Sequence, residues 1–186
     1  MNEIKELVKL VESKDRITLV QATLPVKKTQ LAPQMSAATI DYHFSNLYKG
    51  YVDRYNRQEG NDEFNEAGAF LHDLFFSELQ APSGANKPYG AAEALINRRY
   101  GSYAAFQEKF TEEAMKIQGS GWIYMSRKGD IKIIANHGIR KDIALLVDWW
   151  EHAWALDYQA DKAKYLKNFW SLINWEVVSR RIYAGA

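Results

Sequence analysis

The pattern of apolar and polar positions predicts helices over the first two thirds of the chain. From Ser36 to about Asn56, apolar side chains recur every three or four residues, so we expect one long amphipathic helix with the hydroxyl of Ser36 at its N-cap. The same spacing predicts a second helix from Asn61 or Asp62 to about Leu79. Because only a short turn separates the two helices, they are expected to pack as an antiparallel hairpin.

The period of the pattern changes after the glycine-rich turn at residues 119–121. Before this turn, helical spacing predicts two further helices at residues 91–100 and 102–118. After it, apolar runs predict three short β-strands, and helical spacing then returns for two last helices. These later elements are expected at residues 122–126, 131–135, 143–148, 161–172 and 174–183. The chain also has a helical pattern at residues 2–13 and an extended lead at residues 18–25.

This order of elements predicts an α+β fold with two lobes. The N-terminal lobe would contain the antiparallel helical hairpin, and the C-terminal lobe would contain a small three-stranded antiparallel sheet flanked by helices. The linker candidate is the stretch at residues 82–86, which consists of proline, glycine and small residues. We therefore expect an N-terminal extension and helical-hairpin domain at residues 1–84 and a C-terminal α/β domain at residues 85–186.

Composition narrows the class of protein. Hydrophobic residues make up 47% and charged residues 25% of the chain, as in ordinary globular proteins. A formal charge of +1 argues against non-specific binding to nucleic acid, which needs a concentrated basic face. We expect no membrane span, because the sequence lacks an apolar run of about 18 residues. We expect a cytoplasmic protein, because the first residues include acids where a secretory signal would be basic, and because no cysteine is present for disulfides or thiolate metal sites.

The chain has only four histidines, and their positions suggest a shared site. His43 and His72 lie on the inward faces of the two predicted hairpin helices, and His137 follows the second predicted strand. His152 follows Asp148 by four residues, among several tryptophans. Imidazole and carboxylate groups are good ligands for first-row transition metals. Spacing alone is also compatible with a purely structural role, because a histidine on an apolar face is often a hydrogen-bonded core residue, and Asp148 and His152 could form an ordinary i,i+4 pair.

Six segments of the chain resemble segments of the iron/manganese superoxide dismutases, in the same order. The stretch from Asp148 to Trp154 resembles the D-x-W-E-H-A-Y segment of that family. The other five segments lie at residues 39–52, 64–72, 119–122, 156–158 and 165–175. Together these motifs are highly specific, and the resemblance extends from about residue 24 to residue 183.

The resemblance implies that His43, His72, Asp148 and His152 bind one iron or manganese ion per subunit, together with a solvent molecule. It also implies superoxide as the substrate. One superoxide anion would leave as dioxygen as M(III) becomes M(II), and a second would leave as hydrogen peroxide after taking up two protons. In this family Asp148 ends a strand and His152 belongs to the next segment. Zinc accepts similar ligands but has no second oxidation state, so it would give an inactive protein.

The resemblance assigns catalytic roles to Tyr51 and His137, and positions in the pocket wall to Trp122 and Trp150. In most relatives, a glutamine from the second helix or from just after the sheet hairpin bonds the solvent on the metal. Here the helix position is Gly68, so we expect His137 to replace the glutamine, as in an archaeal-type branch of the family. Because imidazole titrates near neutral pH, we expect pH-dependent activity.

Glu151 is the residue that the resemblance places at a subunit interface. Its carboxylate would reach His152 of the partner subunit, so that each protomer orients a metal ligand of the other. A homodimer is therefore expected, and two dimers could pair into a tetramer.

Three further positions depart from the family pattern. A histidine and a tyrosine that form a gate pair across the dimer interface correspond here to Leu47 and Ala155, and Asn46 replaces a funnel lysine, although Lys49 lies nearby. Trp154 and Tyr48, which lie beside these positions in the sequence, are expected to fill part of the volume. With weaker steering of the superoxide anion, we predict turnover below that of an ordinary family member. The alternatives are a metal-holding or structural protein with slow or lost turnover, a metal-free helical interaction module and, less favoured, a non-haem iron oxygenase.

Overall fold

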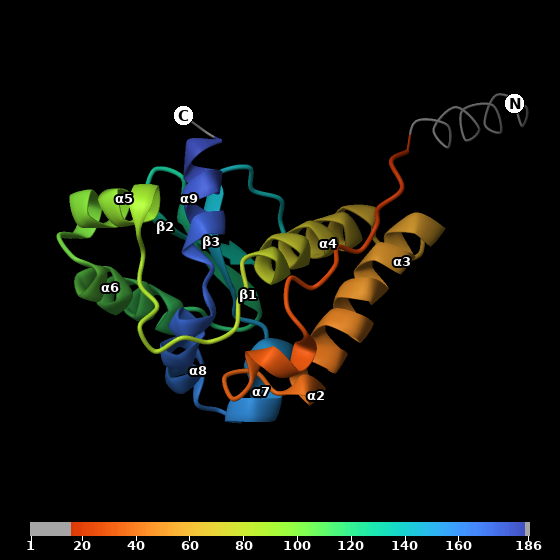
Figure 1. The fold of residues 1–186 in the computed structure, drawn as a ribbon. Coiled ribbons are helices and arrows are strands. Elements are labelled where there is room, and N and C mark those ends of the chain that lie inside the picture. The colour runs from red at the N-terminus through yellow and green to blue at the C-terminus, as the bar shows by residue number, and fades with distance from the viewer. Residues whose placement is uncertain (1–15, 185–186) are drawn as a thin grey trace, which may run out of the picture.

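The structure is a computed structural model that describes residues 16–184 and has two lobes (Figure 1). The helix predicted at residues 2–13 lies outside the described residues. The N-terminal lobe consists of η1 (Lys28–Leu31), α2 (Ala37–Ile40), η2 (Asp41–Tyr48), α3 (Lys49–Arg57) and α4 (Asp62–Ser77). The C-terminal lobe consists of α5 (Gly90–Tyr100), α6 (Tyr103–Met115), β1 (Gly121–Ser126), β2 (Ile131–Ala135), β3 (Ile143–Asp148), α7 (Glu151–Tyr158), α8 (Lys162–Phe169), η3 (Trp170–Leu172) and α9 (Trp175–Tyr183).

One long helix forms the first half of the hairpin, because α2, η2 and α3 follow one another without a break. As predicted, it begins after Ser36, whose hydroxyl accepts a hydrogen bond from the amide of Thr39 at 3.1 Å. It ends where Gln58 adopts a left-handed conformation with φ 58°. Its middle segment η2 is π-helical, a local widening that occurs frequently at functional sites. In this helix, the π segment carries His43.

α4 packs against α3 and completes the predicted hairpin. Its first turn is capped by the side chain of Asn61. The extended segment before η1 lies against the hairpin through polar contacts. Arg16 forms an ion pair with Asp62, and the amide of Ala22 donates to the hydroxyl of Tyr48 at 3.1 Å. The segment therefore contacts both helices of the hairpin.

The sheet has the strand order β2-β1-β3, and both neighbouring pairs are antiparallel. In the central strand, Trp122 lies opposite Ile134 of β2 and opposite Asp148 of β3. Among the described residues, β3 has no strand on its other side, yet it is buried along its whole length. The covering elements are α4 and α9, which both pack against β3.

The predicted α+β fold class is confirmed, with differences in detail. The helix predicted to reach residue 118 ends at Met115, and the one predicted at residues 161–172 is α8 followed by the 3-10 turn η3. The hydrophobic pattern does not predict α7 or η1. In α7 the solvent-facing side also carries an apolar residue, Leu156, which is 60% exposed. Its eight residues therefore show no alternation of apolar and polar positions with a helical period.

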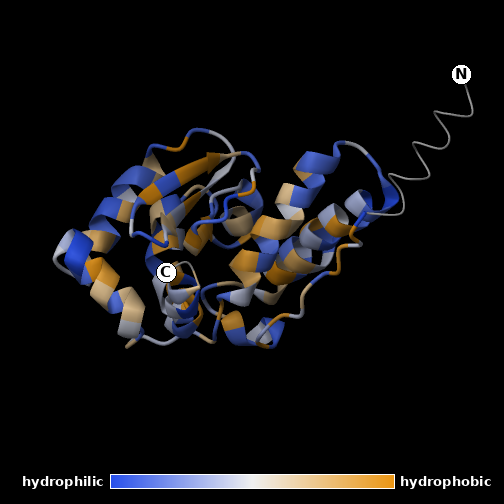
Figure 2. Ribbon diagram, turned by 90° about the horizontal axis from the view of Figure 1, so that it is seen from above, coloured by the Kyte–Doolittle hydropathy of each residue, from blue (hydrophilic) through white to orange (hydrophobic). Residues whose placement is uncertain are grey.

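One continuous cluster of buried apolar side chains joins the two lobes. It extends from Ile40 in the long helix through Phe76 in α4 to Val147 in β3. Figure 2 shows apolar residues on the strands and on helix faces that turn inward. The division into domains at residues 84 and 85 stays a prediction. Over residues 16–184, no helix combines the length and the apolar character needed to cross a membrane.

Candidate metal centre

Four predicted ligands converge at the junction of the two lobes. One potential ligand atom from each of His43, His72, Asp148 and His152 lies within 4.8 Å of every other. Asp148 Oδ2 is at the centre: it lies 3.0 Å from Nε2 of His43, 3.7 Å from Nε2 of His72 and 3.0 Å from Nε2 of His152. Side chains from two helices of the N-terminal lobe and two segments of the C-terminal lobe therefore meet at one point.

Local hydrogen bonds orient these side chains. His72 Nδ1 donates to the carbonyl of Gly68, 2.6 Å away and one helical turn earlier, which turns Nε2 toward Asp148. The amide of Trp150 donates to Asp148 Oδ1 at 2.9 Å, so Oδ2 is the oxygen that faces the imidazoles. As expected, Asp148 ends β3, whereas His152 lies in the first turn of α7. The Asp148–His152 pair is therefore not an i,i+4 pair within one helix.

The chemistry of the cluster fits a metal cation. His43, His72 and Asp148 are fully buried, and both ring nitrogens of His43 and Nε2 of His72 lack a hydrogen-bond partner. Buried polar atoms without partners are unfavourable. A cation that prefers nitrogen and oxygen ligands would satisfy these atoms. Within the described residues, no other group of three or more His, Cys, Asp or Glu side chains is arranged to hold an ion.

Electrostatics favours the protonation states that bind metals. Burial lowers the pKa of His43 to about 4 and, together with the neighbouring His43, holds the pKa of His72 well below its usual range. Burial opposes ionisation of Asp148, but the charge and hydrogen bond of His152 hold the pKa of this carboxyl well below its usual range. At pH 7 the cluster therefore offers His43 and His72 as neutral imidazoles and Asp148 as an ionised carboxylate, which are the forms that ligate metals.

Aromatic rings enclose the cluster. Trp122, which is fully buried, meets the His72 ring edge-on at a centroid distance of 5.0 Å. Trp150 stacks on His152 at 5.7 Å, and Tyr48 stacks on His72 at 5.8 Å. Trp122 and Trp150 thus lie against two of the predicted ligands, and their assignment to the pocket wall stays a prediction. Tyr48 is buried, and the neighbouring Leu47 is half-buried.

Tyr51 and His137 meet beside the cluster. His137 Nε2 lies 3.0 Å from the hydroxyl of Tyr51, and its Nδ1 accepts a hydrogen bond from Trp122 Nε1 at 3.1 Å. His137 also stacks on Trp150 at 4.6 Å. The preceding residue, Asn136, adopts φ 52°, a left-handed conformation that asparagine tolerates and that turns the chain just after β2.

Burial shifts the pKa values of this pair in opposite directions. It lowers the pKa of His137 to about 4, with a smaller opposing effect from the charge of Asp148. It raises the pKa of Tyr51 to about 12, and the charge of Asp148 adds to the rise. The sequence-based expectation of a histidine that titrates near neutral pH is therefore not supported, because the ring stays neutral until the solution is distinctly acidic.

Gly68 provides the space that the Tyr51 ring occupies. A Cβ atom at this position would lie 2.8 Å from both Cγ and Cδ1 of Tyr51. No glutamine side chain fits at this position of α4 while Tyr51 keeps its place. Because of this contact, a polar partner for the site has to come from another element than α4. His137, which follows β2, lies beside the Tyr51 hydroxyl.

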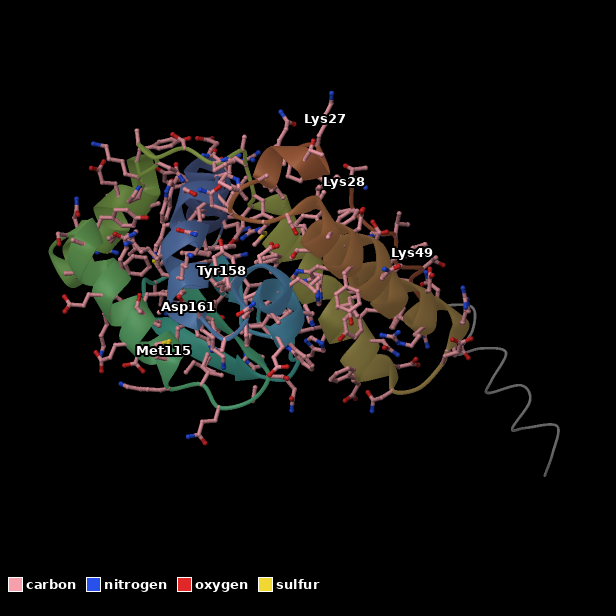
Figure 3. The ribbon with its side chains drawn as sticks, turned by 90° about the horizontal axis from the view of Figure 1, so that it is seen from below. Lys27, Lys28, Lys49, Met115, Tyr158 and Asp161 are labelled. Carbon is pink, nitrogen blue, oxygen red and sulfur yellow. The ribbon has the colours of Figure 1, made fainter. Side chains whose placement is uncertain are left out.

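The remaining predicted residues lie on the surface. Glu151 is exposed at the start of α7, and Ala155 is half-buried one turn later. Lys49 lies on the outside of the long helix (Figure 3), where it forms an ion pair with Asp53. Part of its positive charge is thus balanced by this carboxylate.

Three residues near the centre have no role in the sequence-based interpretation. The hydroxyl of Tyr165 donates to the backbone carbonyl of Asp148 at 3.0 Å. Glu78, at the end of α4, is fully buried and forms an ion pair with Arg181 of α9. No local signal in the sequence marks Glu78 as buried, because its partner Arg181 lies 103 residues later.

Comparison with known proteins gives consistent relatives. Residues 88–181 match the family described as iron/manganese superoxide dismutases, C-terminal domain. The chain is 33% identical to an iron superoxide dismutase of Escherichia coli (strain K12), and the alignment covers 87% of this chain and 96% of that protein. An iron superoxide dismutase of Legionella pneumophila is 30% identical, covering 89% of this chain and 100% of its own length. One of Saccharolobus solfataricus is 32% identical, covering 86% and 90%.

Proposed function

The chain belongs to the iron/manganese superoxide dismutase family, and on this premise we propose that it converts two superoxide anions to dioxygen and hydrogen peroxide at the site formed by His43, His72, Asp148 and His152. The observation that supports this most is the approach of three imidazole Nε2 atoms to one carboxylate oxygen, with buried ring nitrogens left without hydrogen bonds. One iron or manganese ion per subunit, when bound there, supplies the one-electron exchange that dismutation requires.

In this proposal, Tyr51 and His137 hold protons beside the ion. Because an indole N–H can only donate, the bond from Trp122 leaves the proton of neutral His137 on Nε2, facing the Tyr51 hydroxyl. Both groups are uncharged at neutral pH, since burial lowers the pKa of the imidazolium and raises that of the phenol, so the imidazole has a single N–H and the phenol retains its hydroxyl proton. His137 thereby takes the place of the glutamine of most relatives as a donor next to the site.

Association into a homodimer is part of the proposal. Over the described residues, Nδ1 of His152 makes no hydrogen bond, while Nε2 faces Asp148. Glu151, exposed beside it, can reach His152 of the partner subunit in a twofold arrangement, and dimers can pair further into a tetramer. A cytoplasmic location is proposed on the sequence features given above.

A second function is a metal-holding family member with slow or lost turnover. It is favoured by Leu47 and Ala155, which replace both members of the gate pair. Loss of both partners leaves no buried group unpaired, so the fold tolerates it, while proton delivery and substrate access suffer.

One experiment separates these functions. The protein is purified in its native state, its iron and manganese are measured by elemental analysis, and superoxide turnover is measured per bound ion. Dismutase function predicts metal near one equivalent and turnover that scales with metal content, both lost in His72→Ala. Stoichiometric metal without turnover would indicate the metal-holding function. A protein that is folded and free of transition metal would contradict both.

A further inference from the structure

The outer edge of β3 is completed by side chains instead of by a fourth strand. Three residues of β3, Ala144, Leu146 and Asp148, direct their backbone groups away from β1, and one backbone group of each has a side-chain partner. Arg181 donates to the Ala144 carbonyl at 3.1 Å, Glu78 accepts from the Leu146 amide at 3.1 Å, and Tyr165 donates to the Asp148 carbonyl at 3.0 Å (the hydroxyl contact described above). Buried backbone groups need such partners, so these contacts determine where β3 lies.

Glu78 and Arg181 form the charged part of this edge. The Glu78 carboxylate is fully buried, and the guanidinium of Arg181 is only 11% exposed. Arg181 also donates to the carbonyl of Leu74 at 2.6 Å and to the hydroxyl of Ser77 at 3.0 Å, both in the last turn of α4. A guanidinium is favourable near helix carbonyls, whereas a carboxylate alone at a helix C-terminus is not. The buried carboxylate of Glu78 is therefore tolerated at the C-terminal end of α4 because Arg181 is paired with it.

The pair connects the two elements that carry opposing ligands. α4 presents His72 and ends at Ser77, directly before Glu78, and β3 presents Asp148 two residues after Leu146. α4 therefore meets β3 at two points, where Glu78 bonds Leu146 and where His72 Nε2 approaches Asp148 Oδ2 at 3.7 Å. With α4 and β3 fixed at the first point, the distance between the ligands at the second is fixed without help from an ion.

We propose that Glu78 and Arg181 are positioning residues for the metal centre: by joining the end of α4 to the free edge of β3, they set the separation of His72 and Asp148. This inference rests on the proposed function, because it assumes that these ligands bind iron or manganese. Residues of this kind, which hold the ligands but do not touch the ion, change metal affinity by about 10- to 100-fold when they are replaced.

The test uses the full-length, iron-loaded protein at pH 8, because burial raises the pKa of Glu78 to about 7. Two readouts are compared: the rate of iron loss to an excess of chelator and the ferric electron paramagnetic resonance spectrum, which reports ligand geometry. The variants are Glu78→Gln, Arg181→Met and the two combined. Glu112→Gln is the matched control, since Glu112 forms exposed ion pairs with Lys109 and Lys116 on α6.

We expect each single variant to lose iron about tenfold faster than the unsubstituted protein and to show an altered ferric spectrum, while Glu112→Gln matches it. Removing one member of a buried ion pair also destabilises the fold, whereas removing both charges often restores stability. The combined variant is therefore expected to regain its unfolding midpoint while it still loses iron quickly, because the Ala144 carbonyl is left without a donor.

A purely structural role predicts a different result: iron loss would follow the unfolding midpoint through all variants, or the ferric spectrum would stay unchanged, and either outcome would overturn the proposal. If a single variant fails to fold, the combined variant alone is tested, by comparing its rate of iron loss and its ferric spectrum with its unfolding midpoint. Turnover of the unsubstituted protein tests the dismutase function separately, since a protein that binds iron without turnover still reports iron loss in each variant.

Discussion

Trp122 determines which nitrogen of His137 carries a proton. Its indole N–H donates to Nδ1 at 3.1 Å, so the proton of the neutral ring lies on Nε2, 3.0 Å from the Tyr51 hydroxyl. A residue of the central strand thereby sets the donor that faces the site. The Tyr51 ring, in turn, occupies the space that Gly68 leaves free by having no Cβ atom.

Replacing His137 with glutamine tests its role as the hydrogen-bond donor. Glutamine can accept from Trp122 through its oxygen and donate through its amide, but it cannot take up a proton in mild acid. We expect His137→Gln to shift the reduction potential of the metal-loaded protein by on the order of 50 mV, close to a tenfold change for one electron. The acidic limb of the pH–activity profile should move as well. Redox titration and activity profiles measure these changes, and an unchanged potential with an unchanged profile would remove His137 from the mechanism.

Gly68→Ala should destabilise the protein although alanine is the better helix former. The new Cβ would lie 2.8 Å from the Tyr51 ring, and overpacking of this kind costs about 1–3 kcal/mol. Gly50→Ala in α3 is the matched control, because its Cβ would meet only the flexible end of Arg54 at 3.0 Å. That control should gain roughly 0.5–1 kcal/mol. Urea unfolding measures both values, and stabilisation by both substitutions would show that Tyr51 moves without strain.

The metal-free protein should become less stable as pH falls from 6.5 to 4. In this interval an unfolded chain takes up protons on its histidines, while the folded protein resists protonation of His43 and His137, whose pKa values burial lowers to about 4. The free energy of unfolding therefore decreases as the pH is lowered, by roughly 3 kcal/mol for His43 alone. Glu78, whose pKa burial raises to about 7, takes up its proton in the folded state and opposes this loss, but the two histidines together outweigh it. Urea titrations at pH 7 and pH 4.5 give the difference, and equal stabilities would mean that the buried imidazoles take up protons in the fold.

Glu151→Ala should weaken both the dimer and metal retention. Without the carboxylate, His152 of the partner subunit lacks its partner at Nδ1, and the dimer dissociation constant should rise at least about tenfold. Light scattering over a dilution series and elemental analysis measure the two effects. Glu93→Ala, which removes an exposed glutamate from α5, serves as the control. A Glu151→Ala dimer of unchanged affinity and full metal content would place the interface elsewhere.

Restoring the gate pair should raise turnover. Leu47→His combined with Ala155→Tyr supplies two groups that can pair, whereas either single change leaves one polar group without its partner. We expect the combined variant to exceed both single variants and the unsubstituted protein, a non-additive result typical of residues in contact. Turnover per bound ion is the measurement. If turnover in the combined variant equals the sum of the two single effects, the two positions do not meet.

Much of the centre could be predicted because its ligands lie on regular elements. His43 and His72 fall on apolar helical stripes, and Asp148 ends an apolar run, so periodicity alone turns all three inward. That these side chains meet at one point depends on how the two lobes pack against each other. Family resemblance supplied that information, since no local pattern contains it.

Other features could not be predicted because their partners are distant in sequence. Glu78 counts as a polar, outward position in any periodic reading, and its burial follows only from Arg181, which comes 103 residues later. In the π-helical segment the buried residues His43 and Tyr48 are five apart, a spacing that the ordinary helical pattern does not predict. The pKa of His137 likewise depends on burial that only the assembled fold provides.

The aromatic enclosure also makes the centre optically visible. Trp122 touches a ligand ring edge-on and Trp150 stacks on another, so a paramagnetic ion would lie within quenching range of two indoles. Loading and loss of the ion should therefore dim and restore intrinsic ultraviolet emission in real time. Tryptophan fluorescence would thus report how much of the metal site is occupied, without a dye or label.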